Sequence, residues 1–320
     1  TLGTDGLTVE FCKTFWDIFA EGFTQMTNEV LRQKDLTPTQ KEALLSCIYK
    51  KGDRTDLANW RPISLLNTDY KIITKAITNR LKSTLPHIIS RYQTACVPKR
   101  QIHMNLLYTR DIIKYANTEN TKHAAIISID QIKAFDRVNW DYLIRTLTKY
   151  KYGERTIQNI KTLYSNISTK IKANGYISKP FYPTRGVRQG CPLSMTLYIL
   201  QADILLQNVT QNKRIRGMKV NHHETKVTAY ADDTLFYIRK KESIENLNLT
   251  LNKFENATGQ KLNRDKCQGL WIGRNKNKVT GPLKFNWTGR KIHTLGITFR
   301  NDEKDDINAN WNRCTEKIDA

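Results

Sequence analysis

The chain has 320 residues, of which 39% are hydrophobic and 26% charged, so its composition is that of a folded globular protein rather than a disordered one. No run of about 18 apolar residues occurs, so no membrane span is expected. The 52 Lys and Arg against 30 Asp and Glu give a formal net charge of +22. Twelve basic residues, against three acidic ones, lie between positions 50 and 110. This excess of positive charge indicates a polyanionic partner, with nucleic acid as the leading candidate.

The cysteines are scattered and include no CxxC pair that could hold zinc or exchange disulfides. They are Cys12, Cys47, Cys96, Cys191, Cys267 and Cys314. This spacing predicts free thiols in a reducing compartment. The first six residues resemble neither a signal peptide nor a transit peptide, and they lack an initiator Met. We therefore expect an intracellular protein that is a piece of a longer polypeptide.

The N-terminal part of the chain begins with helical periodicity. Residues 7–31 carry apolar side chains at intervals of three and four, which predicts one or two amphipathic helices. Residues 43–49 and 61–66 have the pattern of strands. An apolar stripe over residues 69–85 then predicts a helix that ends at Pro86.

The pattern changes at residues 124–129, a short apolar run that ends in Asp130, as a central strand does when it presents a carboxylate at its tip. Two helices are expected next, the first capped by Asn139 and the second over residues 154–164. A hairpin with its turn at residues 174–175 is expected next, followed by a helix from Pro192 to about residue 211 and a polar surface loop at His222-His223. Two strands are then expected at 226–230 and 234–238, and a helix from 242 to Gly259. The last expected elements are strands near 269–272 and 293–299 and a helix from residue 307.

Three carboxylates lie at the ends of apolar strands. Asp130 follows the strand at 124–129, and Asp232 and Asp233 connect the strands at 226–230 and 234–238. Side chains alternate along a strand, but at a hairpin tip two consecutive ones can reach one site. If the hairpin at residues 226–238 lies beside the strand at 124–130, the three carboxylates converge. Such a cluster is repulsive unless cations neutralise it, and carboxylate oxygens suit Mg²⁺. Two such ions would serve phosphoryl transfer, whereas the ordinary alternative is that these aspartates only form turns.

Four motifs occur in a fixed order around these carboxylates. They are Trp60-Arg61-Pro62-Ile63-Ser64-Leu65-Leu66-Asn67, Ser128-Ile129-Asp130-Gln131-Ile132-Lys133-Ala134-Phe135-Asp136-Arg137-Val138, Arg185-Gly186-Val187-Arg188-Gln189-Gly190-Cys191-Pro192-Leu193-Ser194 and Tyr230-Ala231-Asp232-Asp233. The last resembles the YxDD box of reverse transcriptases, and the second resembles the first catalytic-aspartate motif of the same family. Together they resemble the reverse transcriptases of non-LTR (LINE-type) retrotransposons over nearly the whole chain.

The resemblance implies an α+β fold of the right-hand polymerase type. It would have fingers and a palm, with an antiparallel palm sheet backed by helices and with the thumb largely absent. We expect an N-terminal helical extension at residues 1–40, the reverse transcriptase domain at 41–300, and the start of a thumb or connection at 301–320. Nothing resembles the endonuclease or the Cys/His knuckle of such elements, so we expect a fragment of a longer open reading frame.

The resemblance also implies roles for individual residues. Asp130, Asp232 and Asp233 would be the catalytic residues and the ligands of two Mg²⁺ ions, with Mn²⁺ as a substitute. The nucleotide-binding residues would be Arg61 for the triphosphate oxygens, Phe135 as an aromatic gate against the ribonucleotide 2′-OH, Gln189 and Gly190 for the floor of the pocket, and Lys266 as general acid for the pyrophosphate. Arg185 and Arg188 are expected near the template or the triphosphate. Core packing is the alternative for Phe135, and a solvated surface position is the alternative for Lys266.

The predicted function is RNA-directed DNA polymerase, in which a primer 3′-OH attacks the α-phosphate of a dNTP and pyrophosphate leaves. The expected partners are an RNA template, a DNA primer or target and dNTPs, within a larger polypeptide and ribonucleoprotein, and without a membrane. A eukaryotic retrotransposon would place the protein in the nucleus and cytoplasm.

Three alternatives stay open at this point. One is a decayed or repurposed copy that binds nucleic acid without catalysis, because Ile132 and Met195 depart from the usual family pattern. The intact acidic set argues against it. Another is an RNA-templated RNA polymerase, which Phe135 and the Tyr-Ala-Asp-Asp box disfavour. The third is a group II intron reverse transcriptase.

Overall fold

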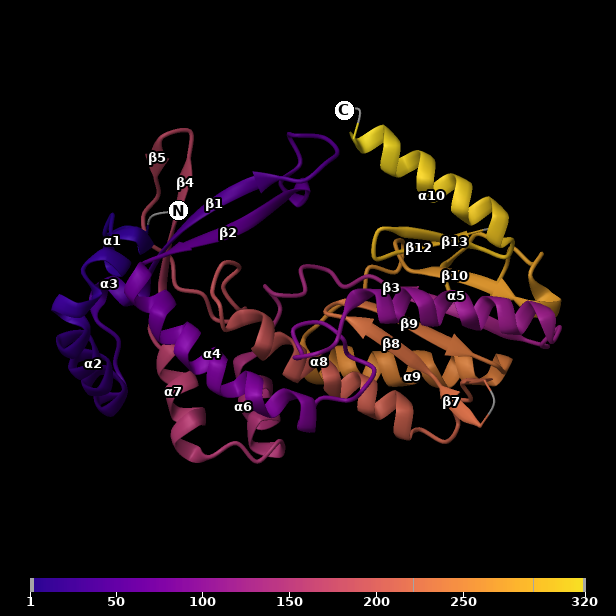
Figure 1. The fold of residues 1–320 in the computed structure, drawn as a ribbon, viewed down its shortest axis with the longest axis horizontal. Coiled ribbons are helices and arrows are strands. Elements are labelled where there is room, and N and C mark those ends of the chain that lie inside the picture. The colour runs from indigo at the N-terminus through magenta and orange to yellow at the C-terminus, as the bar shows by residue number, and fades with distance from the viewer. Residues whose placement is uncertain (1–2, 221, 290, 319–320) are drawn as a thin grey trace. The chain divides into compact units, whose positions relative to one another are not determined.

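The computed structural model describes residues 3–220, 222–289 and 291–318 of the chain. Its contacts divide the chain into two compact units, and each unit consists of two separate stretches of sequence. The first unit comprises Thr1–Thr84 and Phe135–Tyr198, and the second comprises Leu85–Ala134 and Ile199–Ala320. Figure 1 labels the elements of both units.

The first unit begins with helices. The two helices α1 (Val9–Thr14) and α2 (Trp16–Gln33) confirm the amphipathic helices expected over residues 7–31. A capping box at Thr37 then starts the short helix α3 (Pro38–Lys41). These helices lead directly into the first strand of a sheet.

The sheet of the first unit has four strands in the order β2-β1-β4-β5. They are β1 (Glu42–Tyr49), β2 (Trp60–Leu66), which follows the short helix η1 (Leu57–Asn59), β4 (Ser168–Ala173) and β5 (Tyr176–Ile177). Strand β1 pairs antiparallel with β2 and parallel with β4, so two distant stretches of sequence share one sheet. Asn174 and Gly175 form the β4–β5 turn with positive φ, which confirms the predicted hairpin.

Three longer helices complete the first unit: α4 (Thr68–Ile88), which begins in this unit, α6 (Trp140–Lys149) and α7 (Glu154–Tyr164). Asn139 caps α6 by accepting a hydrogen bond from the Tyr142 N–H at 2.9 Å, as the sequence predicted. The buried Tyr70 hydroxyl donates to the Leu163 carbonyl at 3.1 Å and so joins α4 to α7.

The apolar stripe over residues 69–85 predicted a helix that ends at Pro86, and this end is wrong, because α4 continues to Ile88. Proline removes one N–H donor and is costly in the middle of a helix. In the last turn the loss is confined to one bond, and the Ile89 N–H still bonds to the Leu85 carbonyl at 3.0 Å.

The second unit is built on a five-stranded sheet in the order β11-β10-β3-β9-β8. Its strands are β3 (Ala124–Ile129), β8 (Val227–Tyr230), β9 (Asp233–Ile238), β10 (Gln268–Ile272) and β11 (Asn286–Trp287). Neighbouring strands are antiparallel except for β10 and β11, which pair in parallel. The predicted antiparallel sheet is therefore present, with one parallel strand at its edge.

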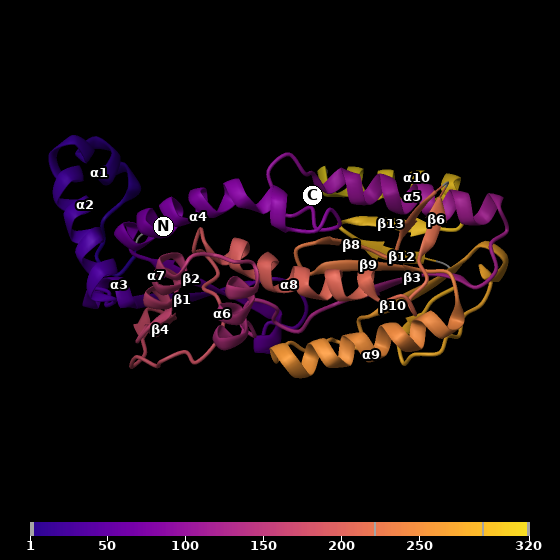
Figure 2. The same cartoon turned by 90° about the horizontal axis from the view of Figure 1, so that it is seen from below.

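Helices cover both faces of this sheet. Ile127 and Phe236 pack with residues of α8 (Ser194–Gln211) and α9 (Lys241–Thr258), whereas Ile126 and Tyr237 pack with α5 (Ile102–Thr118). Figure 2 shows α5 and α9 on opposite sides of β3, β8 and β9. Because neighbouring residues of a strand point to opposite faces, the apolar run of β3 is buried on both sides.

The remaining elements of the second unit are short hairpins, one short helix and a C-terminal helix. They are β6 (Met218–Val220), β7 (His223–Thr225), η2 (Gly273–Asn275), β12 (Lys291–Thr294), β13 (Ile297–Arg300) and α10 (Glu303–Ile318). The expected loop at His222-His223 is only partly correct, because β7 begins at His223 and pairs with β6. Three-residue strands are too short to give a periodic signal.

The structure also bears on the predictions about thiols and membranes. The cysteine side chains that it describes form no disulfide, and those of Cys191 and Cys267 are buried. Within the described ranges, no helix has the length and hydropathy needed to cross a membrane.

Candidate functional site

Asp130 follows β3 directly and is exposed. Strand β3 lies between β9 and β10, so the carboxylate stands at the end of a central strand of the second unit. Ser128 pairs with Leu235 of β9 and with Gln268 of β10. The Asp130 carbonyl accepts a hydrogen bond from the Asn263 N–H at 2.8 Å, which fixes the backbone at this position.

Asp232 and Asp233 lie at the tip of the β8–β9 hairpin. Tyr230 pairs with Asp233, so the turn between the strands contains only Ala231 and Asp232. Both aspartates are exposed. Since Thr234 pairs with Ile129, the turn lies at the same end of the sheet as Asp130. The hairpin therefore lies beside the strand at 124–130, which is the condition set by the sequence for the carboxylates to converge.

These three carboxylates meet part of the requirement for a site that binds a hard divalent cation. By strand alternation, Asp130 lies on the same face of the sheet as Ser128, and Asp233 lies on the same face as Leu235. Because Ser128 pairs with Leu235, Asp130 and Asp233 share one face, while Asp232 lies in the turn. No group of three His, Cys, Asp or Glu side chains within the described residues is arranged to hold a metal ion. Mg²⁺ commonly takes one or two carboxylates together with substrate phosphates, so the donor set fits Mg²⁺ without a closed three-carboxylate cage.

Lys266 lies close to Asp130 along the backbone. It is exposed, in a turn just before β10. The Lys266 N–H bonds to the Asn263 carbonyl at 3.0 Å, and Asn263 in turn bonds to Asp130. The neighbouring Cys267 is buried beside Asp130, and burial raises the pKa of its thiol. The structure thus brings Lys266 and Asp130 onto adjoining segments of the second unit.

Phe135 belongs to the first unit and is half-buried. Its ring lies against that of Tyr198, with the centroids 5.2 Å apart and the planes at 45°. Its carbonyl accepts a hydrogen bond from the Val187 N–H at 2.9 Å. This bond joins the segment after Asp130 to the motif at residues 185–194.

Gln189 and Gly190 lie against β2. The Ser64 N–H donates to the Gln189 carbonyl at 2.7 Å. Gly190 has a φ of +114°, and a Cβ at this position would stand 2.6 Å from the Ser64 carbonyl oxygen. The close contact with β2 and the positive φ are therefore structural reasons for glycine at this position. Arg61 is exposed on the same strand, three residues before Ser64.

Arg188 has a structural position that the sequence did not reveal. Its guanidinium is buried and donates to the carbonyls of Lys41 at 2.6 Å and Ser168 at 3.3 Å. It also lies 5.4 Å from the centre of the Tyr70 ring. These contacts tie the starts of β1 and β4 together, so they argue against the expected position near template or triphosphate. Arg185, by contrast, is exposed.

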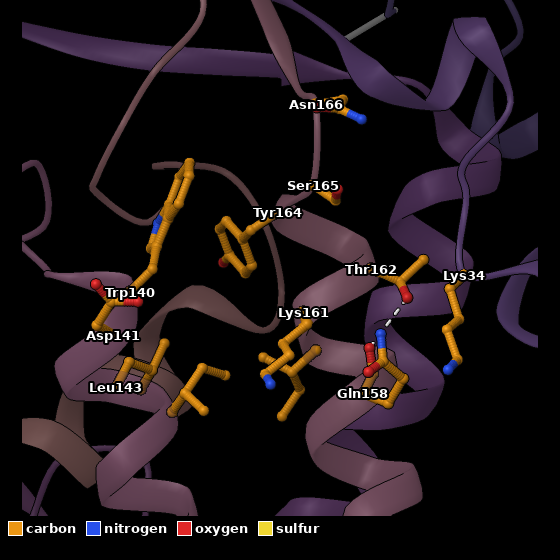
Figure 3. A pocket seen from close by; sticks show the side chains of 12 residues that line it. Lys34, Trp140, Asp141, Leu143, Gln158, Lys161, Thr162, Tyr164, Ser165 and Asn166 are labelled. Carbon is orange, nitrogen blue, oxygen red and sulfur yellow. Dashed lines mark hydrogen bonds between the residues drawn. The ribbon is translucent and has the colours of Figure 1, made fainter.

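A pocket of about 420 Å³ lies in the first unit between α6 and α7. Figure 3 shows Trp140 and Tyr164 facing this pocket, and their ring centroids are 5.8 Å apart. The Trp140 indole N–H donates to the Gly186 carbonyl at 2.8 Å. None of the residues predicted to bind nucleotide or metal lines this pocket, so we do not assign the chemistry to it.

The sheet with carboxylates at one end and helices on both faces defines the right-hand polymerase fold. A solved structure of Candida tropicalis telomerase with a fragment of telomeric RNA matches 90% of this chain and 47% of its own, with a TM-score of 0.58 and 12% identity. A truncated apo telomerase from the same organism matches 83% of this chain and 54% of its own, with a TM-score of 0.55 and 12% identity. At this identity the likeness concerns the fold alone.

The amino-acid sequence shows the family to which the chain belongs. The family model described as "Reverse transcriptase (RNA-dependent DNA polymerase)" matches residues 48–299, and the chain belongs to this family. A 149 kDa protein of transposon TX1 from Xenopus laevis is 36% identical over 94% of this chain. The Pol polyprotein of the type-2 retrotransposable element R2DM and the RNA-directed DNA polymerase of mobile element jockey, both from Drosophila melanogaster, are 27% and 25% identical over 69% and 85% of the chain.

The chain spans only part of these relatives: 23% of the TX1 protein, 20% of the R2DM polyprotein and 30% of the jockey polymerase. All three come from mobile elements, which confirms the resemblance to retrotransposon reverse transcriptases. The roles of individual residues stay predictions.

Proposed function

We propose that this chain is the fingers and palm of a non-LTR retrotransposon reverse transcriptase and catalyses RNA-directed DNA synthesis. The observation that carries the proposal is the position of Asp130 and the Asp232 turn at the same end of two paired strands. Membership of the reverse transcriptase family supports it. The reaction joins the primer 3′-OH to the α-phosphate of a dNTP and releases pyrophosphate.

In this proposal Asp130, Asp232 and Asp233 hold Mg²⁺, with Mn²⁺ as a substitute. When bound, two such ions lower the pKa of the attacking hydroxyl and stabilise the leaving oxygen. Lys266 donates a proton to the departing pyrophosphate, and its turn next to Asp130 supports this role.

The residues of the first unit would bind the incoming nucleotide. Arg61 binds triphosphate oxygens through its guanidinium fork, and Gln189 and Gly190 form the floor of the pocket. Phe135 limits the space available to a 2′-OH. The hydrogen bond between Gln189 and Ser64 supports this group, because it links two of the motifs that are predicted to contact the nucleotide.

We further propose an RNA template and a DNA primer or target as partners, in a larger polypeptide and ribonucleoprotein, which a eukaryotic retrotransposon would place in the nucleus and cytoplasm. The net charge of +22 and the basic stretch between positions 50 and 110 support a polyanionic partner. We assign the catalytic domain to residues 41–300, preceded by a helical extension at 1–40 and followed by the start of a thumb at 301–320. The family match over residues 48–299 supports the central assignment.

Primer extension on an RNA template with Mg²⁺ and dNTPs tests the proposal, with Asp232→Asn run beside the wild-type chain. We expect the wild type to extend the primer and the variant to bind primer–template without extending it. Binding without extension by both would instead support the alternative of a nucleic-acid-binding copy that lacks catalysis. Equal extension by both would contradict the assignment of Asp232.

A further inference from the structure

The turn that carries Asp232 has an unfavourable backbone conformation. Ala231 precedes Asp232, is buried, and has a φ of +56°. Residues other than glycine rarely adopt positive φ, because the Cβ crowds the backbone. A two-residue turn of this kind needs support from its surroundings to stay in one conformation.

Gln93 supplies that support. Its side chain is fully buried, and its amide nitrogen donates to the Ala231 carbonyl at 3.2 Å. Its amide oxygen accepts hydrogen bonds from the N–H groups of Ala231 at 2.9 Å and Ala95 at 3.1 Å. One side chain therefore holds both polar backbone groups of Ala231, the residue directly before Asp232.

The backbone around Gln93 is itself fixed to the hairpin. The Ala229 N–H donates to the Tyr92 carbonyl at 2.8 Å, and the Thr94 N–H donates to the Ala229 carbonyl at 2.9 Å. The Asn105 side chain donates to the same Ala229 carbonyl at 3.0 Å. The segment at residues 92–94 thus runs along β8 like an additional parallel strand.

Arg100 holds this segment from its other side. Its guanidinium donates to the Gln93 carbonyl at 2.7 Å and to the Ile89 carbonyl at 3.1 Å. The backbone of Gln93 is therefore also held by Arg100, which is not part of the hairpin.

We propose that Gln93 is a positioning residue, which holds the Ala231 backbone so that the Asp232 carboxylate is oriented for a divalent cation. This inference rests on the proposed function, because it gives Asp232 a metal-binding role. A glutamine suits the task because one amide both donates and accepts. Methionine has a similar length but forms none of these hydrogen bonds, and glutamate keeps the acceptors while losing the donor when it is ionised.

The test compares Gln93→Met and Gln93→Glu with Gln40→Met. Gln40 is also buried and hydrogen-bonded through its side-chain amide, but it caps α3 in the first unit. Mn²⁺ binding by the full chain with primer–template is measured by electron paramagnetic resonance, and single-turnover dNTP incorporation is measured in parallel. Circular dichroism shows whether each variant folds.

We expect Gln93→Met to bind Mn²⁺ about tenfold more weakly than the wild type, the magnitude typical of residues that orient a metal ligand. Incorporation should slow by about 10–100-fold, since small displacements of a reacting group are costly. The affinity for primer–template should stay within about twofold. Gln93→Glu should fall between the wild type and Gln93→Met, and it carries the test alone if Gln93→Met does not fold.

Two outcomes separate this inference from the proposed function. If the Gln93 variants bind Mn²⁺ and extend the primer as well as Gln40→Met does, the positioning role is overturned while the polymerase assignment stands. If the wild type binds Mn²⁺ but makes no DNA, the proposed function fails, and the Mn²⁺ affinities still decide the role of Gln93.

Discussion

The two units of the chain present their candidate residues on very different scaffolds. In the second unit, β3 and β9 are almost entirely buried, with helices on both faces, and the aspartates stand at their ends. In the first unit, β2 is an edge strand that is mostly half-buried, and it carries Arg61 in an exposed position. The carboxylates are therefore placed by a packed core, whereas Arg61 lies on an exposed edge strand.

This difference matches what the proposed function requires of each group. Carboxylates that share metal ions must stay within a fraction of an ångström of one geometry, and strands of a packed sheet provide that precision. A surface that binds and releases a nucleotide at every step does not need the same rigidity. We therefore expect substitutions in the second unit to lower kcat, and substitutions in the first unit to act on KM or on the choice of nucleotide.

The largest effect is expected at Asp130. Asp130→Asn removes the charge of a proposed metal ligand at the end of β3, and the loss of several kcal/mol of transition-state stabilisation should lower kcat by more than about 1,000-fold. Single-turnover primer extension measures the rate, and thermal unfolding checks that the fold is kept. Asp141→Asn, at an exposed position of α6, is the control and should retain full activity. Substantial extension by Asp130→Asn would contradict the metal assignment.

A smaller loss is expected at Lys266. General acids typically contribute about 10²–10⁴-fold, so Lys266→Ala should slow incorporation by about 100-fold while leaving KM for the dNTP nearly unchanged. Lys261→Ala is a matched control, because Lys261 is an exposed lysine of the same segment, and its backbone carbonyl, which the substitution keeps, accepts a hydrogen bond from the Ile132 N–H. Equal rates for the two variants would assign Lys266 to the solvated surface instead.

A substitution of Gly190 tests the prediction that changes in the first unit act on KM. Gly190→Ala places a Cβ 2.6 Å from the Ser64 carbonyl at a φ of +114°, so the loop must shift away from β2. We expect a destabilisation of about 1–3 kcal/mol and a roughly tenfold higher KM for dNTPs, with kcat less affected. Gly153→Ala is the control, because Gly153 has an ordinary φ and an added Cβ would meet no atom within 4 Å. A fall in kcat alone would break the contrast between the units.

The sequence predicted local features well because they depend on neighbouring residues. The strand that ends at Asp130, the tight turn before Asp233 and the cap at Asn139 all follow from spacing within a few positions. Local spacing does not show whether β3 lies beside the β8–β9 hairpin, and the register of β3 with β9 establishes that it does.

Contacts between distant residues could not be predicted in this way. The sequence pattern does not predict helix α5, which covers one face of the second sheet, and the parallel pairing of β1 with β4 has no local signal. The burial of Arg188 against the Lys41 carbonyl and the bonds from Gln93 to Ala231 also depend on chain segments that are far apart in sequence. Periodicity reports which face of an element is apolar, but not which element covers it.

The smallest expected effect concerns the choice of nucleotide and Phe135. Phe135→Val shortens the side chain that is proposed to exclude a 2′-OH, so kcat/KM for ribonucleotides should rise about tenfold relative to dNTPs. The variant also loses the ring contact with Tyr198, which should cost about 0.5–1.5 kcal/mol of stability. Phe135→Tyr keeps the ring and should keep both the selectivity and the stability. If Phe135→Val lowers stability but discriminates against ribonucleotides as before, the ring serves core packing alone, and another part of the chain must select the sugar.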